Sequence, residues 1–249
     1  MLELGLREVH AGEEQAWNRE ALALPVAGSA LACWCYAAPG LVLGAGQRAT
    51  ADLQARARER GIDVVNRISG GGAVLAGPWM LALSLLLPAS HPVVQSGLHV
   101  GFRRLGAALC RAFGDFGVAA RPASEADLQR SGARARERDL GWACFGAVSH
   151  GEAVDPAGRK LAGLAQCRKQ TGTLLVAGVL LSEPDWPLLC ELFAKPASVG
   201  EALRSGTAST ASRHSRPPDA AAFCVALARE VRAEFTDSGE NGRGGRGSV

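Results

Sequence analysis

The chain has 249 residues, of which 47% are hydrophobic, enough to fill the core of one domain. Its 27 Lys and Arg residues nearly balance its 24 Asp and Glu residues, and a net charge of +3 without a basic surface interleaved with aromatic residues argues against a nucleic-acid partner. The first residues lack the pattern of a signal peptide, and the longest hydrophobic run, Trp79 to Leu87, is far shorter than the roughly 20 residues that span a bilayer. We therefore expect a cytoplasmic protein without a membrane partner.

The cysteines indicate reduced thiols rather than a disulfide framework. There are 7 of them, an odd number, and they are scattered through a chain of medium length. They do not form the two closely spaced pairs that are typical of a zinc site. We therefore expect no bound metal.

Hydrophobic periodicity and turn residues predict both helices and strands. Helices are expected over residues 13–24, 51–60, 100–116, 187–193 and 220–235. Strands are expected over residues 31–36, 40–43, 62–65, 73–75, 79–87, 153–154, 161–166 and 173–181. Adjacent strands with separated helices favour an α+β domain with a mixed or antiparallel sheet and flanking helices. We assign residues 1–236 to one domain and expect the Gly-rich, polar residues 237–249 to form a disordered tail.

A glycine-rich segment lies between two predicted strands and reads RISGGGAV at residues 67–74. Three successive glycines remove every Cβ from the turn, so backbone N–H groups can converge on an anion or a carboxylate while Arg67 supplies a forked cation. The alternative is an ordinary flexible turn. The spacing fits neither a Walker A loop nor a dinucleotide fingerprint.

Lys160 and Cys144 are the residues whose chemistry suggests a reaction. Only three of the basic residues are lysine, so Lys160 is conspicuous in a chain that otherwise uses arginine. An ammonium near a thiol suits acyl transfer, because the cation polarises a carbonyl while the thiolate attacks it. The alternatives are an exposed lysine in a turn and a buried structural thiol. His150 is a possible general base, although an exposed loop histidine is the more common case.

These segments resemble the catalytic domain of the lipoate-protein ligase and octanoyltransferase family, which is related to the biotin ligases. In that family an Arg-x-Ser-Gly-Gly-Gly-Ala-Val loop lines the acyl pocket, and residues 67–74 match it. The family segment Gly-x-Lys-x-x-Gly-x-Ala-Gln/Tyr-x-Arg carries a lysine that contacts the acyl carbonyl, and residues 158–168 read GRKLAGLAQCR. The similarity covers roughly residues 10–210 and includes GAGQ at 44–47 and GTLL at 172–175.

The resemblance implies a biotin/lipoate ligase-like fold and a set of site residues. It implies Cys144 and Lys160 as catalytic residues. It also implies substrate-binding roles for Arg67, Ser69, Gly70, Gly71, Gly72, Ala73, Gly163, Ala165, Gly172 and Thr173.

The thiol distinguishes between activities within the family. Cysteine-dependent octanoyltransferases and amidotransferases carry Ala-Cys-Phe, then Ser-x-x-Glu, then the lysine segment, and this chain has that order at residues 143–145, 149–152 and 158–168. The resemblance thus implies transfer of an octanoyl or lipoyl group to a lysine of a lipoyl-domain protein, through a thioester on Cys144. The donor would be acyl carrier protein or another acylated protein, and no cofactor would be needed.

Two other functions remain open. One is an ATP-dependent lipoate-protein ligase, which would use ATP and Mg and form a lipoyl-adenylate held by Arg67. The other is a protein that binds lipoyl or octanoyl carriers without turnover. The chain departs from the family at Asn66, at Ala76-Gly77 in place of His-Asp, and at Thr171-Gly172. These losses of polar groups indicate an altered acyl or acceptor preference or reduced activity.

Overall fold

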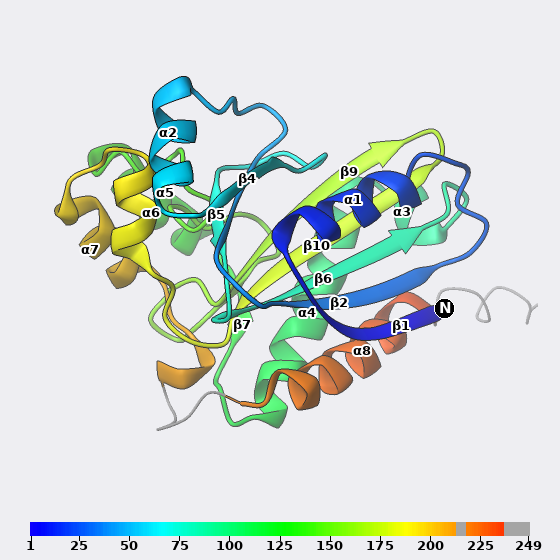
Figure 1. The fold of residues 1–249 in the computed structure, drawn as a ribbon. Coiled ribbons are helices and arrows are strands. Elements are labelled where there is room, and N and C mark those ends of the chain that lie inside the picture. Colours follow the sequence, from blue (N-terminus) through cyan, green and yellow to red (C-terminus); the bar gives the residue numbers. More distant parts are fainter. Residues whose placement is uncertain (213–217, 237–249) are drawn as a thin grey trace, which may run out of the picture.

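The computed structural model describes residues 1–212 and 218–236, and its centre is a twisted five-stranded sheet (Figure 1). The strand order is β1-β2-β6-β10-β9, with bounds Leu2–Val9, Ala30–Tyr36, Met80–Leu87, Gly172–Leu180 and Ala162–Lys169. β1 pairs with β2 in parallel and the other pairs are antiparallel. The predicted α+β class with a mixed sheet is therefore confirmed.

The central strand β6 is buried along its whole length, which explains its unbroken hydrophobic sequence. On one face of the sheet, α4 (Leu98–Asp115) and α8 (Ala220–Thr236) pack with hydrophobic residues such as Leu109 and Leu227. On the other face lies α1 (Ala11–Ala21), as Figure 1 shows. Because side chains alternate along a strand, β6 supplies Leu81 and Leu83 to the first face and Met80 and Ala82 to the second.

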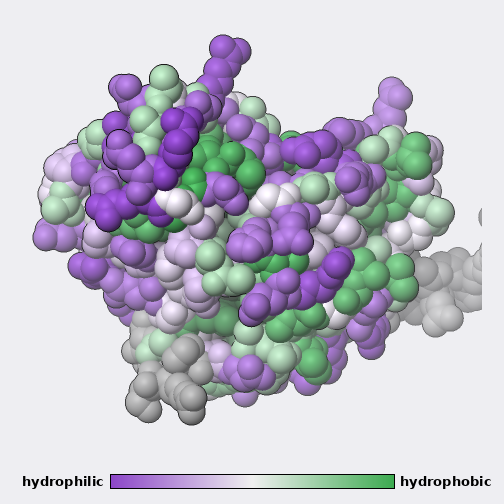
Figure 2. Space-filling view, viewed as in Figure 1, coloured by the Kyte–Doolittle hydropathy of each residue, from purple (hydrophilic) through white to green (hydrophobic). Residues whose placement is uncertain are grey.

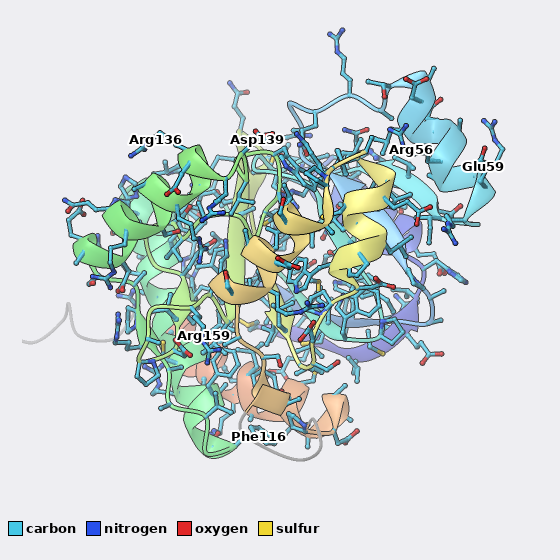
Figure 3. The ribbon with its side chains drawn as sticks, turned by 90° about the vertical axis from the view of Figure 1, so that its left-hand side faces the viewer. Arg56, Glu59, Phe116, Arg136, Asp139 and Arg159 are labelled. Atoms are coloured by element: carbon cyan, nitrogen blue, oxygen red, sulfur yellow. The ribbon has the colours of Figure 1, made fainter. Side chains whose placement is uncertain are left out.

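A second sheet and several helices gather at one end of the molecule. The three-stranded sheet has the order β4-β3-β5, with bounds Asp63–Asn66, Gly40–Leu43 and Val74–Ala76. Helices α2 (Ala51–Glu59), α5 (Glu125–Glu137), α6 (Trp186–Leu192) and α7 (Ala197–Gly206) lie at this end, and Figure 3 shows Arg56, Glu59 and Arg136 on its periphery. The short strands β7 (Arg121–Pro122) and β8 (Ala153–Val154) form a separate pair.

The face of the molecule seen in Figure 2 is not continuously apolar. In the view of Figure 2, hydrophilic groups break the hydrophobic area into patches. Within residues 1–212 and 218–236, no helix has both the length and the hydrophobicity to cross a membrane.

The sequence predicts most elements to within a few residues and misses six. The three longest of these are β1, α5 and α7, and the short ones are α3 (Pro92–Gln95), β7 and a 3₁₀ helix at Thr210–Ser212. α5 buries Asp127, Ser131 and Ala135, so it has no hydrophobic stripe to reveal it. Most β1 side chains are exposed, so the strand has no buried hydrophobic face to mark it. The assignment of residues 1–236 to one domain stays a prediction, and the predicted tail, residues 237–249, lies outside the described residues.

Candidate active site

The glycine-rich loop and the cysteine segment are joined by backbone hydrogen bonds. The Ala73 N–H donates to the Trp142 carbonyl over 2.7 Å, and the Cys144 N–H donates to the Ala73 carbonyl over 2.8 Å. A Cβ on Gly72 would lie 2.6 Å from the Trp142 carbonyl oxygen and 2.8 Å from the Cys144 nitrogen. Glycine at position 72 is thus needed for this close approach.

Arg67 holds the glycine-rich loop through hydrogen bonds from its guanidinium. Its guanidinium donates from Nε and Nη2 to the Gly70 carbonyl, at 3.2 and 2.9 Å, and from Nη2 to the Gly72 carbonyl at 2.9 Å. Gly71 has a φ of +102°, a left-handed conformation that favours glycine. The turn is therefore a fixed structure rather than a flexible connection.

Lys160 is buried, with 2% of its surface exposed, and is not an exposed lysine in a turn. Its Nζ donates to the Cys144 carbonyl at 2.7 Å and to the Ala147 carbonyl at 2.9 Å, and it pairs with Glu152 Oε2 at 2.8 Å. The ammonium also lies 5.2 Å from the centre of the Phe145 ring. Because an ammonium has three protons, these three acceptors account for all of them.

Glu152 is a site residue that the sequence prediction omitted. Its side chain is 2% exposed, and besides pairing with Lys160 it accepts from the Ser149 N–H at 2.8 Å and the Leu164 N–H at 3.0 Å. A buried ion pair is tolerated when its remaining polar atoms are satisfied in this way. The spacing of Ser149 and Glu152 in the sequence was the signal that could have identified it.

The Cys144 thiol and the Lys160 ammonium face a common space above Gly163. A Cβ on Gly163 would lie 3.4 Å from Cys144 Sγ and 3.5 Å from Lys160 Nζ. Cys144 itself is partly exposed, in contrast to the lysine. A reachable thiol beside a fixed cation is suited to attack on a carbonyl carbon whose oxygen becomes negatively charged.

The thiol opens into a pocket of about 580 Å³, including its open mouth, between the large sheet and α1. Ser69, Gly163 and Ala165 of the predicted set line it, as do Arg67 and Cys144. Its hydrophobic lining residues are Val42, Ile68, Val74, Ala76, Met80, Ala82, Phe145, Leu164, Leu174, Val176 and Ala177. Four polar lining residues were not predicted: Glu14, Gln15, Asn18 and Tyr36. Three of them belong to α1, where the sequence gives no signal that the polar side faces inward.

Some predicted residues do not line this pocket. Gly172 and Thr173 begin β10 and do not line the pocket, although the next residue, Leu174, does. Gly70 and Gly71 are exposed at the tip of the loop, and Ala73 is buried behind it. His150 is exposed, with its ring 5.7 Å from that of His99. In the described part of the chain, no group of three or more His, Cys, Asp or Glu residues is placed to hold a metal.

The fold and the site together define a class of protein. A mixed sheet with a glycine-rich loop and a cysteine segment at one pocket, and a buried lysine bonded to the cysteine segment, matches the expected lipoate and biotin ligase-like catalytic domain. The structure of a lipoate-protein ligase A bound with ATP superimposes with a TM-score of 0.67, covering 94% of this chain and 85% of that one, at 16% identity. At that identity the similarity establishes the fold.

Sequence comparison then establishes the family. The chain belongs to the family of the lipoyl protein ligase A/B catalytic domain, whose family model matches residues 17–231. It is 35% identical over 166 residues to octanoyltransferase LipM of Exiguobacterium sp. strain AT1b, covering 65% of this chain and 57% of the relative. It is 31% identical over 150 residues to octanoyltransferase LipM of Moorella thermoacetica, covering 60% of this chain and 52% of the relative. The chain thus spans little more than half the length of these relatives.

Proposed function

We propose that this protein is an acyltransferase that moves an octanoyl or lipoyl group from a thioester donor to a lysine of a lipoyl-domain protein. The observation that carries the proposal is the placement of Cys144 Sγ and Lys160 Nζ on either side of the Cβ position of Gly163, where Cys144 and Gly163 line a largely apolar pocket. The similarity to two octanoyltransferases supports it.

The first step of the proposed reaction loads the enzyme. The Cys144 thiolate attacks the carbonyl carbon of the donor thioester, a carbon–sulfur bond to Cys144 forms, and the bond to the donor sulfur breaks. The donor leaves as a thiol, with the proton that Cys144 gave up. Lys160 places a positive charge beside the acyl oxygen while that oxygen carries developing negative charge.

The second step releases the acyl group to the acceptor. The amine of the acceptor lysine attacks the acyl-cysteine carbonyl, an amide bond forms, and Cys144 leaves and regains a proton from the amine. The two steps exchange one acyl bond for another, so neither needs ATP. The acceptor is proposed to be a lipoyl domain, and the donor an acyl carrier protein or another acylated protein.

The hydrogen bonds of Cys144 support a fixed nucleophile. Its N–H is held by the glycine-rich loop and its carbonyl by Lys160, so both sides of the residue are anchored. Lys160 thus has two proposed roles, positioning Cys144 and placing charge beside the acyl oxygen.

All seven cysteines are free thiols, which supports a cytoplasmic location.

The test is the intact mass of an apo lipoyl domain after incubation with the protein and an octanoyl thioester, without ATP. The proposal predicts the mass of one octanoyl group on the acceptor, and its loss in Cys144→Ser. A parallel reaction contains lipoate and ATP with Mg. A lipoyl mass that requires ATP and survives Cys144→Ser would establish a ligase, and no mass in either reaction would favour a carrier-binding protein.

A further inference from the structure

Helix α1 turns polar side chains towards the pocket. Glu14, Gln15 and Asn18 are 4%, 6% and 1% exposed, although polar side chains are usually found on the outer face of a helix. All three line the pocket that contains Cys144. Their burial is therefore a feature of the substrate cavity rather than of the hydrophobic core.

Glu14 is the centre of this polar group. Its carboxylate accepts from the Asn18 Nδ2 at 3.2 Å and from the Tyr36 hydroxyl at 2.5 Å. Burial raises the pKa of Glu14, and hydrogen bonds from Tyr36, Asn18 and Gln15 oppose that rise. The carboxyl group is thus satisfied within the protein.

Asn18 has one side-chain atom without a hydrogen-bond partner. Its Oδ1 is buried and has no hydrogen-bond partner among the described residues, and Asn18 is one of the residues that line the pocket. The orientation of the amide follows from its neighbour, because Nδ2 must donate to Glu14. An unpaired buried acceptor is costly, so a donor from a ligand or from water is expected there.

The floor of the pocket leads from the thiol towards this polar group. Gly163, Gly178 and Ala82 are paired in register across β9, β10 and β6, and the next partner is Trp34 on β2. Three strand spacings separate Gly163 from Trp34, roughly 14 Å in all. Tyr36 stands two residues further along β2. Of this row, Gly163, Gly178 and Ala82 line the pocket, and their small size leaves room for an acyl chain that begins at Cys144 and runs towards Tyr36 and α1.

We propose that the far end of the pocket is a subsite for an acyl group that carries a hydroxyl remote from its carbonyl, and that Asn18 Oδ1 accepts the hydrogen bond from that hydroxyl. The inference rests on the proposed acyl transfer and specifies its substrate. A plain octanoyl chain fills the same floor but leaves Asn18 Oδ1 without a donor. The hydroxylated acyl group is therefore the preferred one.

The test separates binding from transfer. Binding of free 8-hydroxyoctanoate and octanoate is measured by calorimetry with Cys144→Ala, which cannot form the thioester. We expect the hydroxylated acid to bind about three- to tenfold more tightly, the usual effect of one added hydrogen bond. Asn18→Leu in the same background should abolish the difference, and Glu20→Leu, on the exposed side of α1, should preserve it.

Equal binding of the two acids, or tighter binding of octanoate, would overturn the inference and assign a water molecule to Asn18 Oδ1. If Asn18→Leu fails to fold, the ratio in the Cys144→Ala protein alone decides. Transfer of both thioesters at equal rates by the unmodified protein would overturn the subsite and leave the proposed function standing. A binding preference without transfer of either thioester would preserve the subsite and contradict the proposed function.

Discussion

Lys160 uses all its N–H bonds inside the protein, so its charge is fixed in place rather than free to move. Its partner Glu152 is equally buried. Removing one partner of a buried ion pair leaves a charge without compensation, which typically lowers stability by about 3 kcal/mol or more. We predict such a loss of unfolding free energy for Glu152→Gln, measured by urea denaturation.

A surface pair provides the control for that measurement. Arg204 and Glu183 are half exposed, so Glu183→Gln should change stability by less than about 1 kcal/mol. The double variant Lys160→Met with Glu152→Leu removes both charges and should recover part of the loss. A double variant that loses more unfolding free energy than Lys160→Met and Glu152→Leu lose together would contradict this view of the pair.

At the scale of elements, the contact between the glycine-rich loop and the cysteine segment depends on Gly72. A methyl group there would meet backbone atoms at 2.6 to 2.8 Å, and backbone cannot move aside easily. We predict that Gly72→Ala displaces Cys144 and lowers stability by about 1–3 kcal/mol, with loss of acyl transfer. Gly70→Ala is the matched control, because nothing lies within 4 Å of its Cβ position. Equal activity in the two variants would show that the contact does not position the thiol.

Helix α5 is held by a buried carboxylate that makes its stability depend on pH. Asp127 accepts hydrogen bonds from Arg121, Arg130 and Ser124, and those from Arg121 and Ser124 hold the pKa of Asp127 well below its usual value. Because this pKa is lowered, ionised Asp127 stabilises the fold at pH values above the unfolded pKa of about 3.9. This stabilisation is lost as the pH falls from there through the folded-state pKa.

Wild-type stability should therefore fall as the pH is lowered below about 4. Asp127→Asn should cost about 1–3 kcal/mol at pH 7 and flatten this acid dependence, measured by urea denaturation at several pH values. Glu125→Gln, at an exposed position of the same helix, should retain the wild-type profile. An unchanged profile in Asp127→Asn would assign the acid sensitivity to other carboxylates.

For the whole molecule, the sequence predicts those parts whose signals are local. The hydrophobic run of β6 and the spacing of Leu105, Leu109 and Phe113 in α4 identify the large sheet and one of its helices. Cys144 and Lys160 are found through motifs, and the fold brings them together. Glu152 was omitted from the predicted site, and Asn18 could not be found because its polar side chain resembles that of an exposed helix face. Only the tertiary arrangement turns it towards the pocket.

The most direct test of the account is the mass of the protein itself after brief incubation with an octanoyl thioester and no acceptor. If Cys144 forms the thioester, the protein gains one octanoyl group on the peptide that contains Cys144. This group is removed by hydroxylamine and is absent from Cys144→Ser. Acceptor octanoylation that proceeds without this adduct, or an adduct on a different cysteine such as Cys35 or Cys167, would contradict the thioester mechanism.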